Sequence, residues 1–156
     1  MKKILLITAS LLIASAVGAQ NDDPIYYRPP KKTKETTIIA WSPLSASINY
    51  KKAVKACFSQ GFGIHHADST LGMITTVWKD LGKTNSNIQV TALAEDDRII
   101  FRAQLIVNAT INLGYASSNP SNSTVSNYGG RGSPNRLAWE ALENVARTVS
   151  DSLTYK

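Results

Sequence analysis

RIIFRAQLIVNATINLG, residues 98–114, is the stretch that decides the fold. Every second residue from Ile99 to Leu113 is apolar, whereas the residues between them are mostly Arg, Gln, Asn and Thr, with Ile100 and Ile106 as exceptions. Such alternation predicts one long antiparallel strand that packs one face on the core and turns the other largely toward water. We therefore expect a sheet that is covered on one side.

Three shorter strands are predicted before it. Residues 62–67 and 73–79 alternate around a turn at residues 68–72, which is typical of a β-hairpin. Residues 88–94 alternate again and lead into the acidic turn 95–97, after which the long strand begins. No helical pattern interrupts these strands, so we expect them to form an antiparallel meander.

Two helices are predicted to flank the strands. Apolar and small residues recur at helical spacing over residues 48–60, and Gly61 follows as a stop signal. Later, Ser133 supplies an N-cap, Pro134 occupies the first helical position, and an apolar stripe continues to Leu153. The sequence thus predicts an α+β fold in which a four-stranded antiparallel meander carries two helices on one face, in the order α-β-β-β-β-α.

The first residues have the pattern of a secretory signal. Lys2 and Lys3 precede an apolar run over residues 4–17, and small side chains follow up to Ala19. This pattern predicts a signal peptide over residues 1–19 and an exported protein, periplasmic or extracellular, that is soluble after cleavage. The run is short for a membrane span, which needs about 20 apolar residues, so an uncleaved anchor is the less favoured alternative.

The remaining chain divides into a tail and one domain. Residues 20–37 contain three prolines and mixed charge with little to bury, which predicts an extended or disordered tail. This tail is either a spacer or a partner-binding strip anchored by Tyr26 and Tyr27. Residues 38–156 have the size of a single α+β domain. Within them, residues 114–133 are rich in Ser, Asn and Gly and predict a long loop.

Charge and cysteine content narrow the classes of function. The formal net charge is +6, but the basic residues are scattered and form no stripe of the kind that binds nucleic acid. Cys57 is the single cysteine, so no internal disulfide can form and stability must come from a packed core. Because Cys57 lies on the apolar side of the first predicted helix, we expect a buried, unreactive thiol.

The adjacent histidines in GFGIHHADSTLGMITTVW, residues 61–78, are the strongest candidate for chemistry. On a strand, His65 and His66 point to opposite faces, which leaves His66 and Asp68 as the ligands available locally. A zinc site needs three or four ligands, so we predict neither a metal nor another cofactor here. With no serine elbow and no separated carboxylate pair, we also expect no enzymatic activity.

Several residues are candidates for binding instead of catalysis. The stretch YGGRGSPN, residues 128–135, could present backbone N–H groups and Arg131 to an anion, although a flexible approach to a capped helix explains the same residues. Tryptophans could line a groove or complete the core. The predicted binding residues lie in the tail, on the sheet and before the second helix: Tyr26, Tyr27, Trp78, Arg98, Arg102 and Arg131.

The stretch AVKACFSQGFGIHHADSTLGMITTVW, residues 53–78, resembles a known pattern in bacterial envelope proteins. A helix ends in a glycine and an aromatic residue, and a strand, a D-x-x-x-G-x-I-x-T turn and a return strand ending in Trp78 follow. This resembles the helix-grip domains of the outer-membrane assembly lipoprotein BamC type. The resemblance implies a non-enzymatic domain that works by protein contact, in part through a proline-containing N-terminal segment. The lipid-carrying cysteine of such lipoproteins is absent after the predicted signal.

The sequence therefore predicts an exported, non-catalytic adaptor of the bacterial envelope that binds another protein through its sheet face or its tail. A periplasmic carrier is the alternative, with a small apolar ligand held between sheet and helices near Trp78. An exported hydrolase would require His66, Asp68 and a third ligand to converge.

Overall fold

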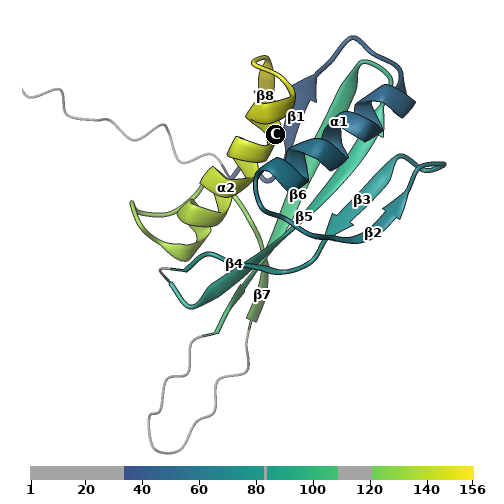
Figure 1. Ribbon diagram of the computed structural model, residues 1–156. Coiled ribbons are helices and arrows are strands. Elements are labelled where there is room, and N and C mark those ends of the chain that lie inside the picture. Colours follow the sequence, from purple (N-terminus) through teal and green to yellow (C-terminus); the bar gives the residue numbers. More distant parts are fainter. Residues whose placement is uncertain (1–33, 83, 109–120) are drawn as a thin grey trace, which may run out of the picture.

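The computed structural model describes residues 34–82, 84–108 and 121–156 (Figure 1). These residues form an antiparallel sheet of eight strands and two helices, so the predicted α+β class is confirmed and the predicted number of four strands is wrong. The elements along the chain are β1 (Ile38–Trp41), α1 (Ala46–Ser59), β2 (Ile64–Asp68), β3 (Met73–Thr76), β4 (Lys79–Asp80), β5 (Ser86–Glu95), β6 (Arg98–Val107), β7 (Ser121–Thr124), α2 (Pro134–Val149) and β8 (Leu153–Tyr155).

The two long strands β5 and β6 form the centre of the sheet. The strand order is β2-β3-β5-β6-β1-β8, with β4 paired to β5 and β7 paired to β6. The four predicted strands correspond to β2, β3, β5 and β6. The other four are short, and β7 (SNST) has no apolar alternation, so periodicity gives no signal for them.

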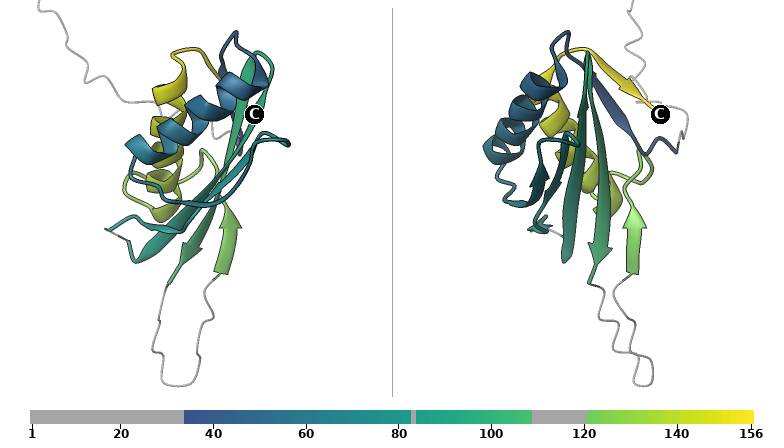
Figure 2. Two further views of the ribbon diagram at one scale, coloured as in Figure 1. Left: turned by 45° about the vertical axis from the view of Figure 1, so that its right-hand side comes forward. Right: turned by 90° about the vertical axis from the view of Figure 1, so that its right-hand side faces the viewer.

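Both helices cover the same face of the sheet (Figure 2). From β6, the alternate residues Ile99, Phe101, Ala103 and Leu105 are buried under them. Helix α1 approaches the sheet with small side chains, whereas α2 fills the core with larger ones; the buried residues are Ala53, Ala56 and Cys57 from α1 and Ala138, Trp139, Leu142, Val145 and Ala146 from α2. The period-two pattern of β6 and the helical period of α2 thus meet in one core.

The connection from β1 to α1 is held by the turn between β5 and β6. Ser45 precedes α1 but makes no capping hydrogen bond with its side chain, and Asp96 Oδ1 instead accepts the N–H of Ala46 at 2.8 Å. Asn49 is fully buried, and its side-chain amide donates to the carbonyls of Leu44 and Glu95 at 3.0 and 2.9 Å. The predicted turn at residues 95–97 is confirmed and also serves as the cap of a distant helix.

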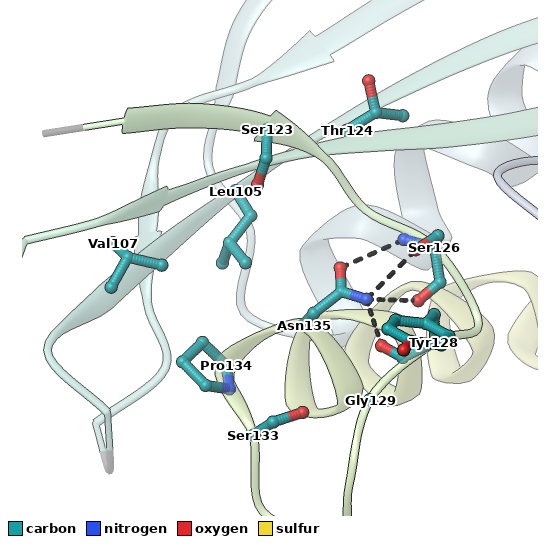
Figure 3. A pocket seen from close by; sticks show the side chains of 10 residues that line it. All are labelled: Leu105, Val107, Ser123, Thr124, Ser126, Tyr128, Gly129, Ser133, Pro134 and Asn135. Atoms are coloured by element: carbon teal, nitrogen blue, oxygen red, sulfur yellow. Dashed lines mark hydrogen bonds between the residues drawn. The ribbon is translucent and has the colours of Figure 1, made fainter. Parts of the chain in front are cut away.

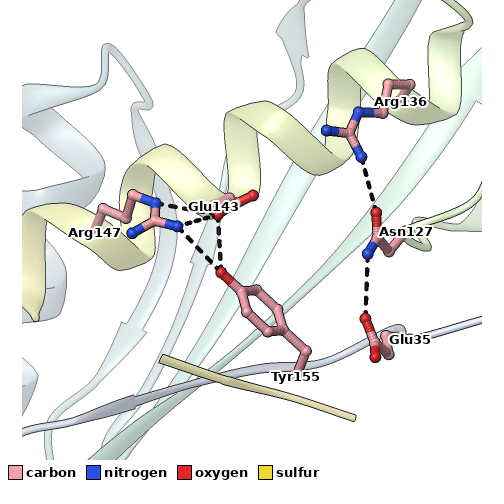
Figure 4. Close-up of polar contacts among 6 residues, drawn as sticks. All are labelled: Glu35, Asn127, Arg136, Glu143, Arg147 and Tyr155. Carbon is pink, nitrogen blue, oxygen red and sulfur yellow. Dashed lines mark hydrogen bonds and ion pairs between the residues drawn. The ribbon is translucent and has the colours of Figure 1, made fainter. Parts of the chain in front are cut away.

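The second helix is shorter than the apolar stripe predicted, and Leu153 belongs to strand β8 instead. Helix α2 ends at Val149, and Ser150 is extended, so Leu153 pairs with Ala40 of β1. The hydroxyl of Tyr155 donates to Glu143 Oε1 at 2.8 Å, and Arg147 binds the same oxygen at 2.6 Å (Figure 4). The side chain of Tyr155 therefore fixes the last strand to α2.

The beginning of the described chain is tied down by similar contacts. The N–H groups of Thr36 and Thr37 donate to the carbonyl oxygen of Lys156 at 2.7 and 2.8 Å. Glu35 accepts a hydrogen bond from Asn127, and the side chain of Asn127 accepts one from Arg136 of α2 (Figure 4). The last residues of the predicted tail 20–37 thus take part in the fold.

The predicted signal peptide, residues 1–19, lies outside the described residues, as does most of the predicted tail. Neither α1 nor α2, the helices of the described part, is long and apolar enough to cross a membrane.

Candidate functional site

The face of the sheet opposite the helices, called the open face below, carries two of the predicted binding residues. Because side chains alternate along a strand, burial of Ile99, Phe101 and Ala103 under the helices directs Arg98, Ile100 and Arg102 to the other side. Figure 2 shows that neither helix covers this side.

Four neighbouring strands each place one apolar residue side by side on the open face. In the strand register, Met73 of β3 lies opposite Leu93 of β5, Leu93 opposite Ile100 of β6, and Ile100 opposite Ile39 of β1. With strands about 4.8 Å apart, this apolar row is about 14 Å long. Leu93 is 36% exposed, whereas Ile39 is 5% exposed, so the row opens toward the β3–β5 side.

Trp41 lies beside this row and is held in a fixed orientation. It is paired with Arg98, two positions along the register from the pair of Ile39 and Ile100, and is 42% exposed. Its indole N–H donates to Thr154 Oγ1 of β8 at 2.9 Å. An exposed, ordered tryptophan next to aliphatic side chains is typical of a contact surface.

The two arginines on either side of Ile100 differ in their charge environment. Arg98 forms an ion pair with Glu95 at 2.6 Å. The Nε–H of Arg102 donates to Thr37 Oγ1 at 3.2 Å, and among the described residues Arg102 forms no ion pair. Lys156 continues the register opposite Thr37 and is exposed. The positive charge of the open face is therefore concentrated on the side of Arg102.

Of the other predicted binding residues, Trp78 and Arg131 are described by the structure, and neither belongs to the apolar row. Trp78 is 37% exposed and lies between β3 and β4. Arg131 is exposed in the turn before α2. Tyr26 and Tyr27 lie outside the described residues.

The sequence did not predict the apolar row, and it indicated Trp41 only as one of the tryptophans that could line a groove or complete the core. The one available signal was Ile100, an apolar residue at a position of β6 whose neighbours of the same parity are Arg98 and Arg102. Its partners come from strands far apart in the sequence, and β1 was not predicted as a strand. The row therefore becomes visible only with the strand register.

An open depression lies at the start of α2, where β6 and β7 end (Figure 3). Its lining combines apolar side chains with hydroxyl groups: Leu105, Val107, Ser123, Thr124, Ser126, Tyr128, Gly129, Ser133, Pro134 and Asn135. It includes much of the YGGRGSPN stretch that was considered for anion binding.

Several polar groups at this depression, those of Ser126, Ser133 and Asn135, form hydrogen bonds within the protein. The Asn135 amide donates to Ser126 O at 2.8 Å and to Tyr128 O, and its oxygen accepts the N–H of Ser126 at 3.1 Å (Figure 3). Ser133 Oγ accepts the N–H of Arg136 and so caps α2. These contacts fix the segment after β7 onto the helix, which supports the structural interpretation of YGGRGSPN.

The candidates for chemistry do not form a reactive centre. The predicted burial of Cys57 is confirmed, and desolvation raises the pKa of its thiol to about 11, so the thiolate is scarce at neutral pH. The predicted alternation over residues 62–67 is wrong at one point, because the register of β2 against β3 shifts between Ile64 and His66. Both imidazoles are exposed, and no group of three or more metal-ligating side chains occurs among the described residues.

The chain matches no protein-family model and no curated protein sequence. The resemblance of residues 53–78 to the BamC type therefore stays a prediction.

Proposed function

We propose that the protein is a non-catalytic adaptor that binds another protein through the open face of its sheet. The observation that carries this proposal is the apolar row of Met73, Leu93, Ile100 and Ile39, which lies between two arginines on a face that neither α1 nor α2 covers. Apolar side chains at the centre of a surface and charged ones around it are the usual composition of a protein interface.

The residue types beside the row support the same function. Tryptophan, arginine and methionine are enriched at interfaces, and Trp41, Arg98, Arg102 and Met73 provide all three on the open face. The indole of Trp41 is already held by Thr154, so little conformational entropy is lost when a partner covers it.

We further propose that this adaptor acts in the bacterial envelope after export. The signal-like pattern of residues 1–19 and the resemblance of residues 53–78 to BamC-type domains support this setting.

The carrier function predicted as an alternative has less support. A carrier needs space between the sheet and the helices, and the side chains there are packed into one cluster. Phe62, Phe101, Trp139 and Leu142 are at most 1% exposed. A ligand would have to displace core side chains at a cost of several kcal/mol.

Replacement of the most exposed residue of the row tests the adaptor function. Leu93→Asp places a charge in the apolar row, and Phe58→Asp makes the same kind of change on α1, where Phe58 is 58% exposed. Both variants and the wild type would be used as baits in extracts of the native cell envelope, after circular dichroism has verified their folding. We expect Leu93→Asp to lose the partner that the wild type and Phe58→Asp retain. Equal recovery with all three baits would contradict the proposal.

A further inference from the structure

We infer that the partner presents an acidic amphipathic segment, with apolar side chains on the row and carboxylates directed toward Arg102 and Lys156. This inference rests on the proposed adaptor function and adds the chemistry of the partner.

The open face carries an excess of positive charge. Among the acidic residues at this face, Glu95 is neutralised by Arg98, and Asp68 Oδ1 accepts the N–H groups of Thr70 and Leu71 within its own turn. The guanidinium of Arg102 has no carboxylate partner among the described residues. A partner with carboxylates complements this surface, whereas a basic partner would meet uncompensated like charge.

The register also indicates where those carboxylates belong. Arg98 and Arg102 are each two residues from Ile100, so their Cα atoms lie about 6–7 Å on either side of the apolar row. On the Arg98 side, Glu95 already occupies the guanidinium. On the other side, the next register positions are Thr91, Arg102 and Thr37, followed by Lys156. The carboxylates of the partner are therefore expected on this second side, one or two residues from its apolar contacts.

A polypeptide partner fits this face better than an anionic membrane surface does. Membrane recognition through charge typically requires clusters of about four to eight basic residues, and Arg102 and Lys156 are too few. The rows around the apolar residues also contain uncharged polar side chains, Thr75, Thr91 and Gln104, which offer hydrogen bonds to a peptide.

Selection from a random peptide library tests this inference without knowledge of the natural partner. Peptides of about 15 residues, displayed on phage, would be selected against the folded protein, and the enriched peptides would be synthesised. Binding would be located by amide chemical-shift changes in NMR spectra of the 15N-labelled protein. We expect enriched peptides that combine apolar residues with Asp or Glu and that perturb Thr91, Leu93, Ile100 and Arg102.

Reversing the charge of Arg102 tests whether this residue contacts the carboxylates of the peptide. Arg102→Glu should weaken binding of an acidic peptide about tenfold or more, whereas Lys55→Glu, the same change on an exposed position of α1, should leave it within about twofold. A peptide with Lys in place of its carboxylates should recover affinity for Arg102→Glu. If Arg102→Glu does not fold, the neutral variant Arg102→Gln tests the same contact. The affinity of the wild type for the acidic peptide should also fall between about 50 and 300 mM NaCl, because salt screens the charge interaction.

The outcomes separate the inference from the proposed function. Neutral or basic peptides that bind at the open face would overturn the acidic chemistry and retain the adaptor function. Peptides that bind elsewhere, or no enriched peptide at all, would overturn both. Binding of phosphatidylglycerol vesicles through Arg102, with no peptide at this face, would overturn both in favour of a membrane contact.

Discussion

At the residue scale, Cys57 shows how burial fixes the chemistry of one side chain. Desolvation raises the pKa of its thiol from 9.0 to about 11 in the folded protein. A raised pKa means that the folded state holds the proton more tightly than the unfolded state does. The corresponding stability is complete below about pH 9 and is lost as the pH rises toward 11.

This linkage predicts a specific alkaline loss of stability. Between pH 7.5 and 10.5, the free energy of unfolding of the wild type should fall by about 2 kcal/mol more than that of Cys57→Ala, because the variant has no thiol to ionise. Urea unfolding of both proteins at the two pH values measures the difference. Parallel decreases would show that the thiol does not contribute.

Gly72 and Gly82 both have a left-handed backbone conformation, but only Gly72 lies close to another strand. Replacing each glycine by alanine therefore distinguishes the cost of backbone strain from the cost of a steric clash. Gly72 has φ +68°, and a Cβ at this position would lie 2.4 Å from the carbonyl oxygen of Ala94, whereas Gly82 has φ +72° and open space around it. Both Ala variants carry the conformational penalty of about 1 kcal/mol. We expect Gly72→Ala to lose at least about 1 kcal/mol more than Gly82→Ala in urea unfolding. Equal losses would mean that the β3–β5 contact adjusts without cost.

At the element scale, the two helices begin in different ways. The side chain of Ser133 caps α2, whereas the corresponding Ser45 makes no such bond and α1 is capped by Asp96 from the turn between β5 and β6. Ser133→Ala should therefore cost about 1 kcal/mol, Ser45→Ala a few tenths, and Asp96→Ala about 1 kcal/mol, as measured by thermal or urea unfolding. A loss for Ser45→Ala as large as that for Asp96→Ala would contradict this assignment of the caps.

Element length determined how much of the fold could be predicted from the sequence. Strands β5 and β6 and helix α2 span enough residues for their periodicity to emerge, and all three were predicted. Strands β4 and β8 contain two and three residues, and β8 was assigned to the preceding helix because Leu153 continues its apolar spacing. The shift of register at His65 was not predicted either, because an irregularity at one residue leaves no periodic signal.

At the scale of the whole molecule, the two faces of the sheet have different roles. One face supports the helices and contains the core, and its pattern is readable along single strands such as β6. The open face combines Ile39, Met73, Leu93 and Ile100 from four strands, and Trp41 is fixed there by Thr154 of β8. Arg98 and Arg102 of this face could be predicted from one strand, whereas the apolar row between them depends on tertiary pairing.

The central proposal is that the open face is a binding surface. Its most direct test is site-specific photo-crosslinking in the native cells, with benzoylphenylalanine in place of Leu93 on the open face or of Phe58 on α1. We expect a crosslinked product of defined mass from position 93 and none from position 58. Crosslinks from position 58 with none from position 93 would contradict this proposal and assign the contact to the helical side.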